Sequence, residues 1–448
     1  MKLWMGLKDL LVDTVEETTI LAQDAHSEAS RRTFGYLKFV PGLAGPAAVI
    51  ESLEHVGTTL AYKNVRFVNR LVSDSLDTVY GALVSTGVVN ERHLEGSATP
   101  MRSDAVGTSA WIRDSALGAL NGVVGDTLAE RESPLAFDMT LRQDGERVDL
   151  DADRLRQVFE SGNGTLCLFI HGLACTEWSW NLNADMHYGD ASVNYGSQLH
   201  EDLGYTPLYL RYNTGLHVSQ NGQQLAALLE TLVAVSPKPI RQIVLVGHSM
   251  GGLVARSACH YGSEREHAWS KSVRHIFCLG SPHLGTPLEK AGNALTTALH
   301  MTSTASAQIP ARVIDARSAG IKDLRYGYLV DEDWLGMDID APLKDRRRSI
   351  PFLEHATYYF VAATLSESAE HPLGHLLGDW LVRVPSASGY HSDDARRVPF
   401  APENGEVVGG ISHTGLANHP TVYAHIKRWC EAGEPEERKF KAPVATMS

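Results

Sequence analysis

Hydrophobic and polar positions divide the 448-residue chain into two parts with different periodicities. Up to residue 130, apolar residues recur every three or four positions, which is typical of one face of a helix. The clearest stripe consists of Val65, Val68, Val72, Leu76, Val79 and Leu83, and residues 110–128 form a second helical stretch weakened by glycines. We therefore expect a helical N-terminal region over residues 1–130. Its apolar stripes either pack as core or form a surface for a membrane, a lipid particle or a partner subunit.

After residue 130 the pattern changes to short apolar runs that alternate with helix-like stretches. A hairpin is expected over residues 136–151, with Asp144-Gly145 as its turn. Further strands are expected at 164–173, 206–215, 243–246, 273–287, 356–365 and 405–413. Helices are expected at 220–235, after Ser249 and at 420–429, the last with Pro420 in its first turn. This alternation predicts an α/β domain over residues 131–448, with a mostly parallel sheet covered on both faces.

Composition narrows the class of protein. Hydrophobic residues make up 43% and charged residues 21%, which is ordinary for a globular chain. The net charge of −13 argues against nucleic acid as a partner. Five cysteines without paired spacing argue against a disulfide framework or a zinc ribbon. Acidic residues interrupt the N-terminal apolar patch too early for a secretory signal, so we expect a cytoplasmic protein that could touch membranes through its N-terminal helices.

The stretch LVGHSMGG, from Leu245 to Gly252, carries the first sign of chemistry. An apolar, β-branched run ends there on Ser249, and a helix pattern begins directly after it. The pattern G-x-S-x-G places small residues on both sides of the serine. A strand can turn into a helix this sharply only when its neighbours lack bulk, and the central hydroxyl is then presented at the carboxyl edge of the sheet. Ser249 is therefore the candidate nucleophile.

A serine nucleophile needs a base and an acid, in the chain order serine, acid, histidine. His413 is the best base because it follows the last strand and precedes the closing helix; His419 and His425 are weaker candidates. Asp379 is the best acid because it follows the penultimate strand and has apolar neighbours. Asp393 and Asp394 are its rivals, in a charged stretch typical of solvated surface.

An oxyanion hole needs two backbone N–H groups. Met250, the residue after the nucleophile, should supply one. The other should come from Leu173, in the loop after the strand that ends at His171-Gly172. Gly172 permits a close turn there, and we expect His171 to support this loop rather than to react.

Six segments in chain order carry a family resemblance. They are IHGLACTEWSW, LRYNTGLHVSQNG, LVGHSMGGLVARSA, LGSPHLGTPLEKAG, GDWLVRVPSASG and ISHTGLANHPTVYAHIKRW. Over residues 160–430 the chain resembles the α/β-hydrolase superfamily, and within it bacterial triacylglycerol-lipase-like proteins and the GPI-inositol-deacylase-like branch. The resemblance implies an α/β-hydrolase fold and hydrolysis of carboxylic esters through an acyl-enzyme. It also implies the triad Ser249, Asp379 and His413, with Leu173 and Met250 as oxyanion donors.

The resemblance leaves several points open. Some relatives bind calcium or zinc, but no metal site can be placed here: His371 and His375 have ligand-like spacing, yet ordinary loop histidines are favoured. We expect no cofactor and no metal. A small-molecule or lipid ester is the expected substrate, and the oligomeric state is not determined. A thioesterase or acyltransferase with the same triad, or a module that binds lipid surfaces, are the alternatives.

A long insertion over residues 286–350 interrupts the α/β pattern. Leu288, Ala291, Leu295, Ala298 and Leu299 share one helix face within it. We expect this insertion to form a cap over the Ser249 pocket that selects substrates by size. The alternative is that its helix simply packs on the sheet.

Overall fold

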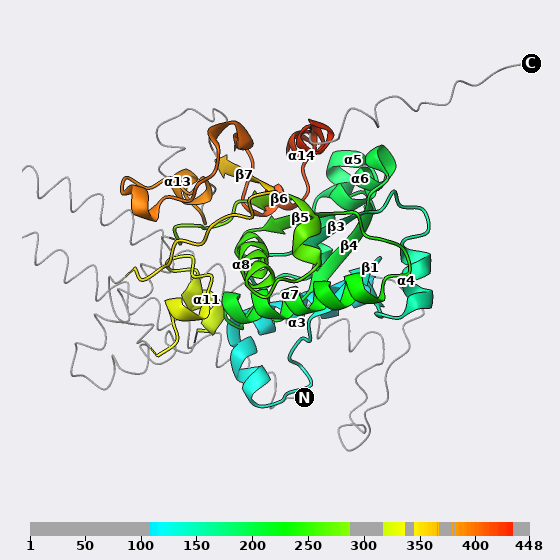
Figure 1. Ribbon diagram of the computed structural model, residues 1–448, viewed down its shortest axis with the longest axis horizontal. Helices are drawn as coiled ribbons and strands as arrows, with labels where there is room; N and C mark the ends of the chain where they lie inside the picture. The colour runs from blue at the N-terminus through cyan, green and yellow to red at the C-terminus, as the bar shows by residue number, and fades with distance from the viewer. Residues whose placement is uncertain are drawn as a thin grey trace, which may run out of the picture.

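The computed structural model describes residues 108–286, 317–336, 345–364, 366, 379 and 381–432. The predicted stripe at residues 65–83 and the apolar face at residues 288–299 lie outside these ranges. Within them the chain forms one eight-stranded sheet flanked by helices (Figure 1).

The strands lie close to where the hydrophobic pattern predicts them. Their bounds are β1 Thr140–Gln143, β2 Glu146–Val148, β3 Thr165–Ile170, β4 Thr206–Arg211, β5 Gln242–His248, β6 Val273–Leu279, β7 Thr357–Thr364 and β8 Gly405–Gly409. The predicted hairpin is present as β1 and β2. Its turn residues, Asp144 and Gly145, have φ values of 52° and 78°, as the predicted Asp-Gly turn requires.

The sheet order is β2-β1-β4-β3-β5-β6-β7-β8. Strands β4, β3, β5, β6, β7 and β8 pair in parallel, and β1 pairs antiparallel with both β2 and β4. From β3 the chain continues to β4 on one side and later to β5 on the other. Such a reversal of strand order opens a crevice at the carboxyl ends of the strands. The loops after β3 and β5 therefore meet at this crevice.

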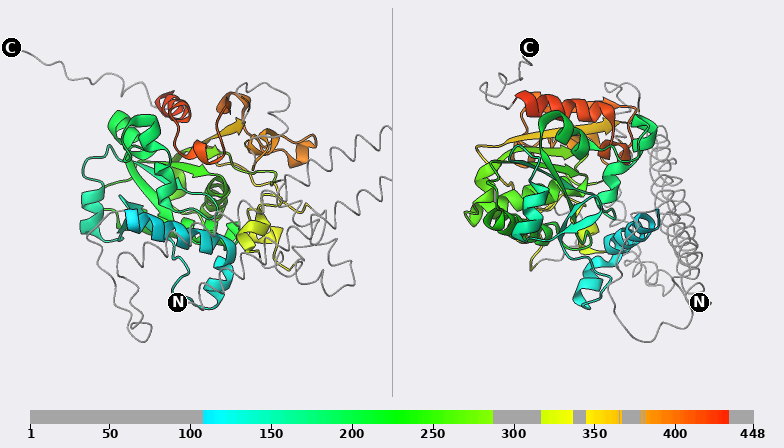
Figure 2. Two further views of the ribbon diagram at one scale, coloured as in Figure 1. Left: turned by 180° about the vertical axis from the view of Figure 1, so that it is seen from behind. Right: turned by 90° about the vertical axis from the view of Figure 1, so that its right-hand side faces the viewer.

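Helices follow most strands. Their bounds are α3 Thr108–Glu130, α4 Ala152–Val158, α5 Ala184–Tyr188, α6 Tyr195–Leu203, α7 Val218–Val235, α8 Met250–Glu264, α11 Ala319–Asp323, α13 Val384–Ala387 and α14 Pro420–Ala432. Helices α7 and α8 lie on one side of the sheet, and α6 and α14 on the other (Figure 2). Among the described helices, none is long and apolar enough to cross a membrane.

Two hydrophobic cores lie on the two faces of the sheet, and β3 contributes to both. Its residues Leu166, Leu168 and Ile170 belong to the core under α7 and α8, whereas Cys167 and Phe169 belong to the core under α6 and α14. Successive side chains of a strand point to opposite faces, so a strand that is buried on both faces is apolar throughout. All six residues of β3 are buried, as this arrangement demands.

Helix α3 links the N-terminal region to the α/β domain through a buried ion cluster. Asp114 on α3 and Glu177 on the helical turn η1 (Glu177–Asn181) both accept hydrogen bonds from Arg211 on β4. Burial raises the pKa of Asp114, but the charge and hydrogen bond of Arg211 outweigh it and leave that pKa below its usual value. The cluster therefore holds α3 against the carboxyl end of β4.

Candidate active site

Ser249 lies between β5 and α8 in a strained backbone conformation. Its φ of 53° and ψ of −123° are outside the regions that non-glycine residues normally adopt. The flanking glycines make the turn sterically possible: a Cβ on Gly247 would lie 2.4 Å from the backbone nitrogen of Gly252, and one on Gly251 would lie 2.1 Å from the carbonyl oxygen of Ile170. The strained serine predicted from the G-x-S-x-G pattern is present.

Asp379 and His413 form a buried pair. The Nδ1 atom of His413 lies 2.7 Å from Oδ2 of Asp379. The exposed fractions of the two residues are 6% for His413 and 2% for Asp379. The second carboxylate oxygen of Asp379 accepts hydrogen bonds from the backbone nitrogens of Leu381 and Val382, at 3.1 and 2.8 Å. Since both carboxylate oxygens are engaged, the acid is held in one orientation toward the imidazole.

Ser249 and His413 both lie next to the residues at the end of β6. The backbone nitrogen of Ser249 donates a hydrogen bond of 2.8 Å to the carbonyl oxygen of Leu279. The next residue, Gly280, has a φ of 61°, and a Cβ there would lie 3.2 Å from both Nδ1 and Cε1 of His413. The serine and the imidazole thus flank the Leu279-Gly280 peptide, which places the candidate nucleophile, base and acid at one edge of the sheet.

His248 is a part of the site that the sequence argument did not single out. Its Nε2 atom lies 2.9 Å from the carbonyl oxygen of His413, and the two ring centroids are 4.9 Å apart. Burial, with a contribution from the neighbouring His413, lowers the pKa of His248 to about 3. A neutral His248 can therefore donate from Nε2 and anchor the loop that carries His413. The sequence offered one signal for this role, because His248 directly precedes the serine in the G-H-S-M-G run.

The candidate oxyanion donors lie on the two loops that meet at the crevice. Met250 is the first residue of α8, where a backbone N–H has no acceptor within the helix. Leu173 follows Gly172, whose added Cβ would lie 3.0 Å from Cβ of Ser249. Over the described part of the chain, the N–H groups of Leu173 and Met250 have no protein acceptor. Both groups are therefore available to an oxygen atom bound next to Ser249.

His171 supports the oxyanion loop, defined here as residues 171–175. It is fully buried, its Nδ1 atom lies 3.0 Å from the carbonyl oxygen of Gly172, and its ring stacks on Tyr212 with centroids 4.5 Å apart. Burial lowers the pKa of His171 to about 3. The hydroxyl of Tyr212 also donates to the carbonyl oxygen of His171 at 2.7 Å. These contacts agree with the supporting role predicted for this residue.

Helix α3 packs directly behind the oxyanion loop. A Cβ on Gly118 would lie 2.9 Å from the carbonyl oxygen of Cys175, and one on Gly122 would lie 2.7 Å from Cα of Ala174. Ala174 itself has a φ of 60°, and its nitrogen donates to the hydroxyl of Thr214 at 3.1 Å. Gly118 and Gly122 weaken the helical pattern predicted for residues 110–128. The same two residues allow α3 to approach the loop.

Part of the predicted cap insertion reaches the same region. Ser318 donates from its hydroxyl to the carbonyl oxygen of Gly122 at 2.6 Å. The backbone nitrogen of Gly320, in α11, donates to the carbonyl oxygen of Gly215 at 3.0 Å. A Cβ on Gly320 would lie 3.1 Å from the Cε atom of Met250. This segment of the insertion therefore contacts both α3 and one of the candidate oxyanion donors.

The rival residues lie elsewhere. Asp393 and Asp394 have side chains that are 55% and 86% exposed and pair with Arg396 and Arg397. The Nδ1 atom of His425 lies 3.3 Å from Glu406. The Nδ1 atom of His419 accepts a hydrogen bond of 3.2 Å from the backbone nitrogen of Thr421. His371 and His375 lie outside the described residues. Within the described ranges, no group of three or more metal-ligating side chains could hold an ion.

The sheet order, the serine between β5 and α8, and the buried acid–histidine pair after β7 and β8 define an α/β-hydrolase fold. This is the predicted fold class. Residues 161–346 match the model of a family described as "PGAP1-like alpha/beta domain", which confirms the predicted resemblance for this part of the chain. No curated protein matches the chain.

Solved structures with a similar arrangement include three hydrolases. The lipase BlEst2 of Bacillus licheniformis, in its mature form, is 18% identical with a TM-score of 0.37, over 60% of this chain and 91% of that one. Lipase 1 of Pelosinus fermentans is 13% identical with a TM-score of 0.35, over 60% and 98%. A thermophilic esterase of Thermogutta terrifontis is 13% identical with a TM-score of 0.33, over 61% and 92%.

Proposed function

We propose that the protein is a serine hydrolase that cleaves carboxylic esters through an acyl-enzyme. The observation that carries this proposal is the 2.7 Å contact between His413 and Asp379 beside a serine in a strained strand-to-helix turn. A serine hydroxyl is a poor nucleophile at neutral pH, so it needs a base that is held in one tautomer. The arrangement supplies that base.

Acylation follows from the orientation of the imidazole. Because the Nδ1–H group of His413 donates a hydrogen bond to Asp379, Nε2 is left as the acceptor. The Ser249 hydroxyl attacks the acyl carbon while Nε2 takes its proton. The tetrahedral intermediate then collapses, the carbon–oxygen bond to the alcohol breaks, and the imidazolium returns the proton to the leaving alkoxide. Asp379 stabilises the imidazolium without itself becoming protonated.

Deacylation uses the same groups in reverse order. Water attacks the acyl carbon while His413 takes its proton, and the Ser249 oxygen leaves with that proton as the free acid is released. The N–H groups of Leu173 and Met250 stabilise the oxyanion in both steps. General-base assistance contributes about 10²–10⁴-fold, and one oxyanion donor contributes about 10²–10³-fold.

The proposal is tested with Ser249→Ala. The variant should retain its fold by circular dichroism but lose hydrolysis of a p-nitrophenyl ester series and labelling by a fluorophosphonate probe. Testing esters of increasing chain length also measures the acyl preference. Labelling of the variant at the rate of the unaltered protein would show that Ser249 is not the nucleophile.

A further inference from the structure

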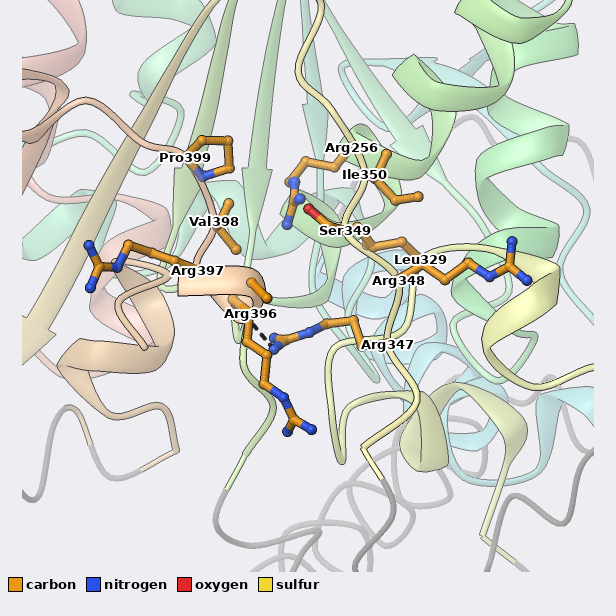
Figure 3. Close-up of a pocket in the computed structure, with 11 residues that line it drawn as sticks. Arg256, Leu329, Arg347, Arg348, Ser349, Ile350, Arg396, Arg397, Val398 and Pro399 are labelled. Carbon is orange, nitrogen blue, oxygen red and sulfur yellow. Dashed lines mark hydrogen bonds between the residues drawn. The ribbon is translucent and has the colours of Figure 1, made fainter. Parts of the chain in front are cut away.

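A strongly basic depression lies apart from the Ser249 site, between α8, residues 347–350 and residues 395–399 (Figure 3). The depression opens to solvent, and its cavity volume is about 20 Å³. Five of its lining residues are arginines and none is acidic: Arg256, Arg347, Arg348, Arg396 and Arg397. In a chain with a net charge of −13, such a concentration of positive charge is a local exception.

Arg256 is the most unusual of these arginines because it is buried without a carboxylate. It is 6% exposed, and within the described residues its hydrogen bond is the contact of Nη1 with Nδ1 of His283, at 3.0 Å. Burial holds the pKa of His283 well below its usual value, so this partner is neutral. The guanidinium also lies 5.4 Å from the ring centroid of Phe352. Neither contact supplies a compensating negative charge.

Arg347 adds a second, partly compensated charge. Its side chain is 8% exposed and lies 3.5 Å from Asp345, a carboxylate that Arg396 also contacts at 3.1 Å. It donates to the carbonyl oxygens of His283 and Arg396. Burial lowers the pKa of Arg256, and the charge of Arg347 contributes to the same lowering. The charge of Arg347 therefore raises the free-energy cost of keeping Arg256 protonated.

The close-up shows which arginines face inward. The guanidinium groups of Arg256 and Arg347 lie in the middle of the depression, whereas those of Arg348 and Arg397 extend away from it in opposite directions (Figure 3). The hydroxyl of Ser349 points toward the side on which the guanidinium of Arg256 lies (Figure 3). Arg397 is engaged outside the depression, with Asp394 at 2.9 Å and over the ring of Tyr390.

We propose that this depression binds a phosphate group between Arg256 and Arg347, with the Ser349 hydroxyl as a further donor. A buried charge without a partner is strongly destabilising, and an anion between the two arginines removes that cost. The planar fork of a guanidinium matches the oxygens of a phosphate, and such charge-assisted hydrogen bonds are the strong ones. The phosphate belongs either to a soluble compound or to the headgroup of a lipid ester.

Binding is tested on the full chain with inorganic phosphate, by calorimetric titration against sodium chloride of matched ionic strength. Arg256→Met keeps the side-chain volume and removes the charge, so it should weaken phosphate binding by about tenfold or more. Without phosphate, the melting temperature of this variant should be equal or higher, because an uncompensated charge has been removed. Arg265→Met is the matched control: Arg265 follows α8 and also lies 5.4 Å from a ring centroid, that of Tyr261, but outside the depression.

Ser349→Ala gives a second test, because Ser349 is exposed and its substitution should change stability little. It should weaken phosphate binding severalfold and leave the melting temperature unchanged. Equal phosphate affinity in the unaltered protein, Arg256→Met and Ser349→Ala would overturn the proposal, as would the absence of binding at matched ionic strength. This titration does not depend on any esterase activity, so it can fail or succeed independently of the proposed function.

Kinetics then distinguish the two sources of phosphate. A short-chain phosphatidic acid and a neutral triacylglycerol of the same chain length are compared as substrates of the unaltered protein and of Arg256→Met. A higher KM for the phosphatidic acid alone assigns the phosphate to the substrate's headgroup. Equal KM changes for both esters, together with the loss of phosphate binding, assign it to a separate soluble ligand.

Discussion

Gly122 and Ala174 are in such close contact that a Cβ on Gly122 would lie 2.7 Å from both Cα and Cβ of Ala174. One residue belongs to α3 and the other to the oxyanion loop. No side chain other than hydrogen fits at position 122 without moving one of the two segments. The N-terminal helix and the candidate oxyanion donor Leu173 are therefore mechanically coupled.

The first prediction concerns this coupling. Gly122→Ala should displace the oxyanion loop and lower kcat by about 10–100-fold with a smaller change in KM, because small displacements of catalytic groups have large effects on rate. Val123→Ala, at the neighbouring 39% exposed position, is the control and should retain activity. Ester hydrolysis and thermal unfolding are measured on both. A folded Gly122→Ala protein with unchanged kcat would contradict the coupling.

The second prediction separates the candidate acids. Asp379→Asn should lower kcat by about 10⁴-fold, since the amide cannot hold His413 in the required tautomer or stabilise the imidazolium. Asp393→Asn should change kcat little, because the Asp393 side chain is 55% exposed and pairs with Arg396. If Asp393→Asn proved the more damaging substitution in the p-nitrophenyl ester assay, the assignment of the acid would be wrong.

The third prediction is a loss of stability in acid that arises from buried neutral histidines. The pKa of His171 is lowered from 6.5 to about 3 by burial. Between these values the unfolded chain binds a proton that the folded protein does not, so the free energy of unfolding falls as pH falls. Each such histidine contributes a slope of about 1.4 kcal/mol per pH unit.

This slope is measured by urea unfolding at a series of pH values. The difference in unfolding free energy between the unaltered protein and His171→Phe should be constant above pH 7.5 and should change steadily below the unfolded pKa of 6.5. A difference that stays constant from pH 8 to pH 4.5 would show that His171 is not buried in its neutral form.

The fourth prediction concerns the buried ion cluster on α3. Arg211→Met leaves the carboxylate of Glu177, whose side chain is 4% exposed, without its hydrogen-bonded cation, and leaves the 5% exposed Asp114 with Arg113 alone. Breaking a buried pair by removing one partner costs about 3–5 kcal/mol. Arg156→Met removes a surface pair with Asp153 and should cost no more than about 1 kcal/mol. Equal losses in urea unfolding would mean that the cluster does not hold α3 in place.

Much of the fold follows from the sequence because its signals are local. The continuous apolar run of β3, the Asp144-Gly145 hairpin and the glycines around Ser249 each depend on residues that are close together in the chain. Local sterics require small residues where a strand turns directly into a helix, so Ser249 could be identified before any contact was known. The topological order of the partners then pointed to Asp379 and His413.

Tertiary structure decided what depends on contacts between distant residues. The neighbouring residues favoured Asp379 over Asp393 and Asp394, but its burial and its hydrogen bond to His413 are properties of the folded chain. The glycines of α3 signal only weak helix propensity in the sequence, whereas the structure shows that their missing side chains make room for the oxyanion loop. Arg256 and Arg347 stand 91 positions apart by their numbers, and no local pattern joins them. Charges so far apart in the chain interact only when the fold brings them to one place.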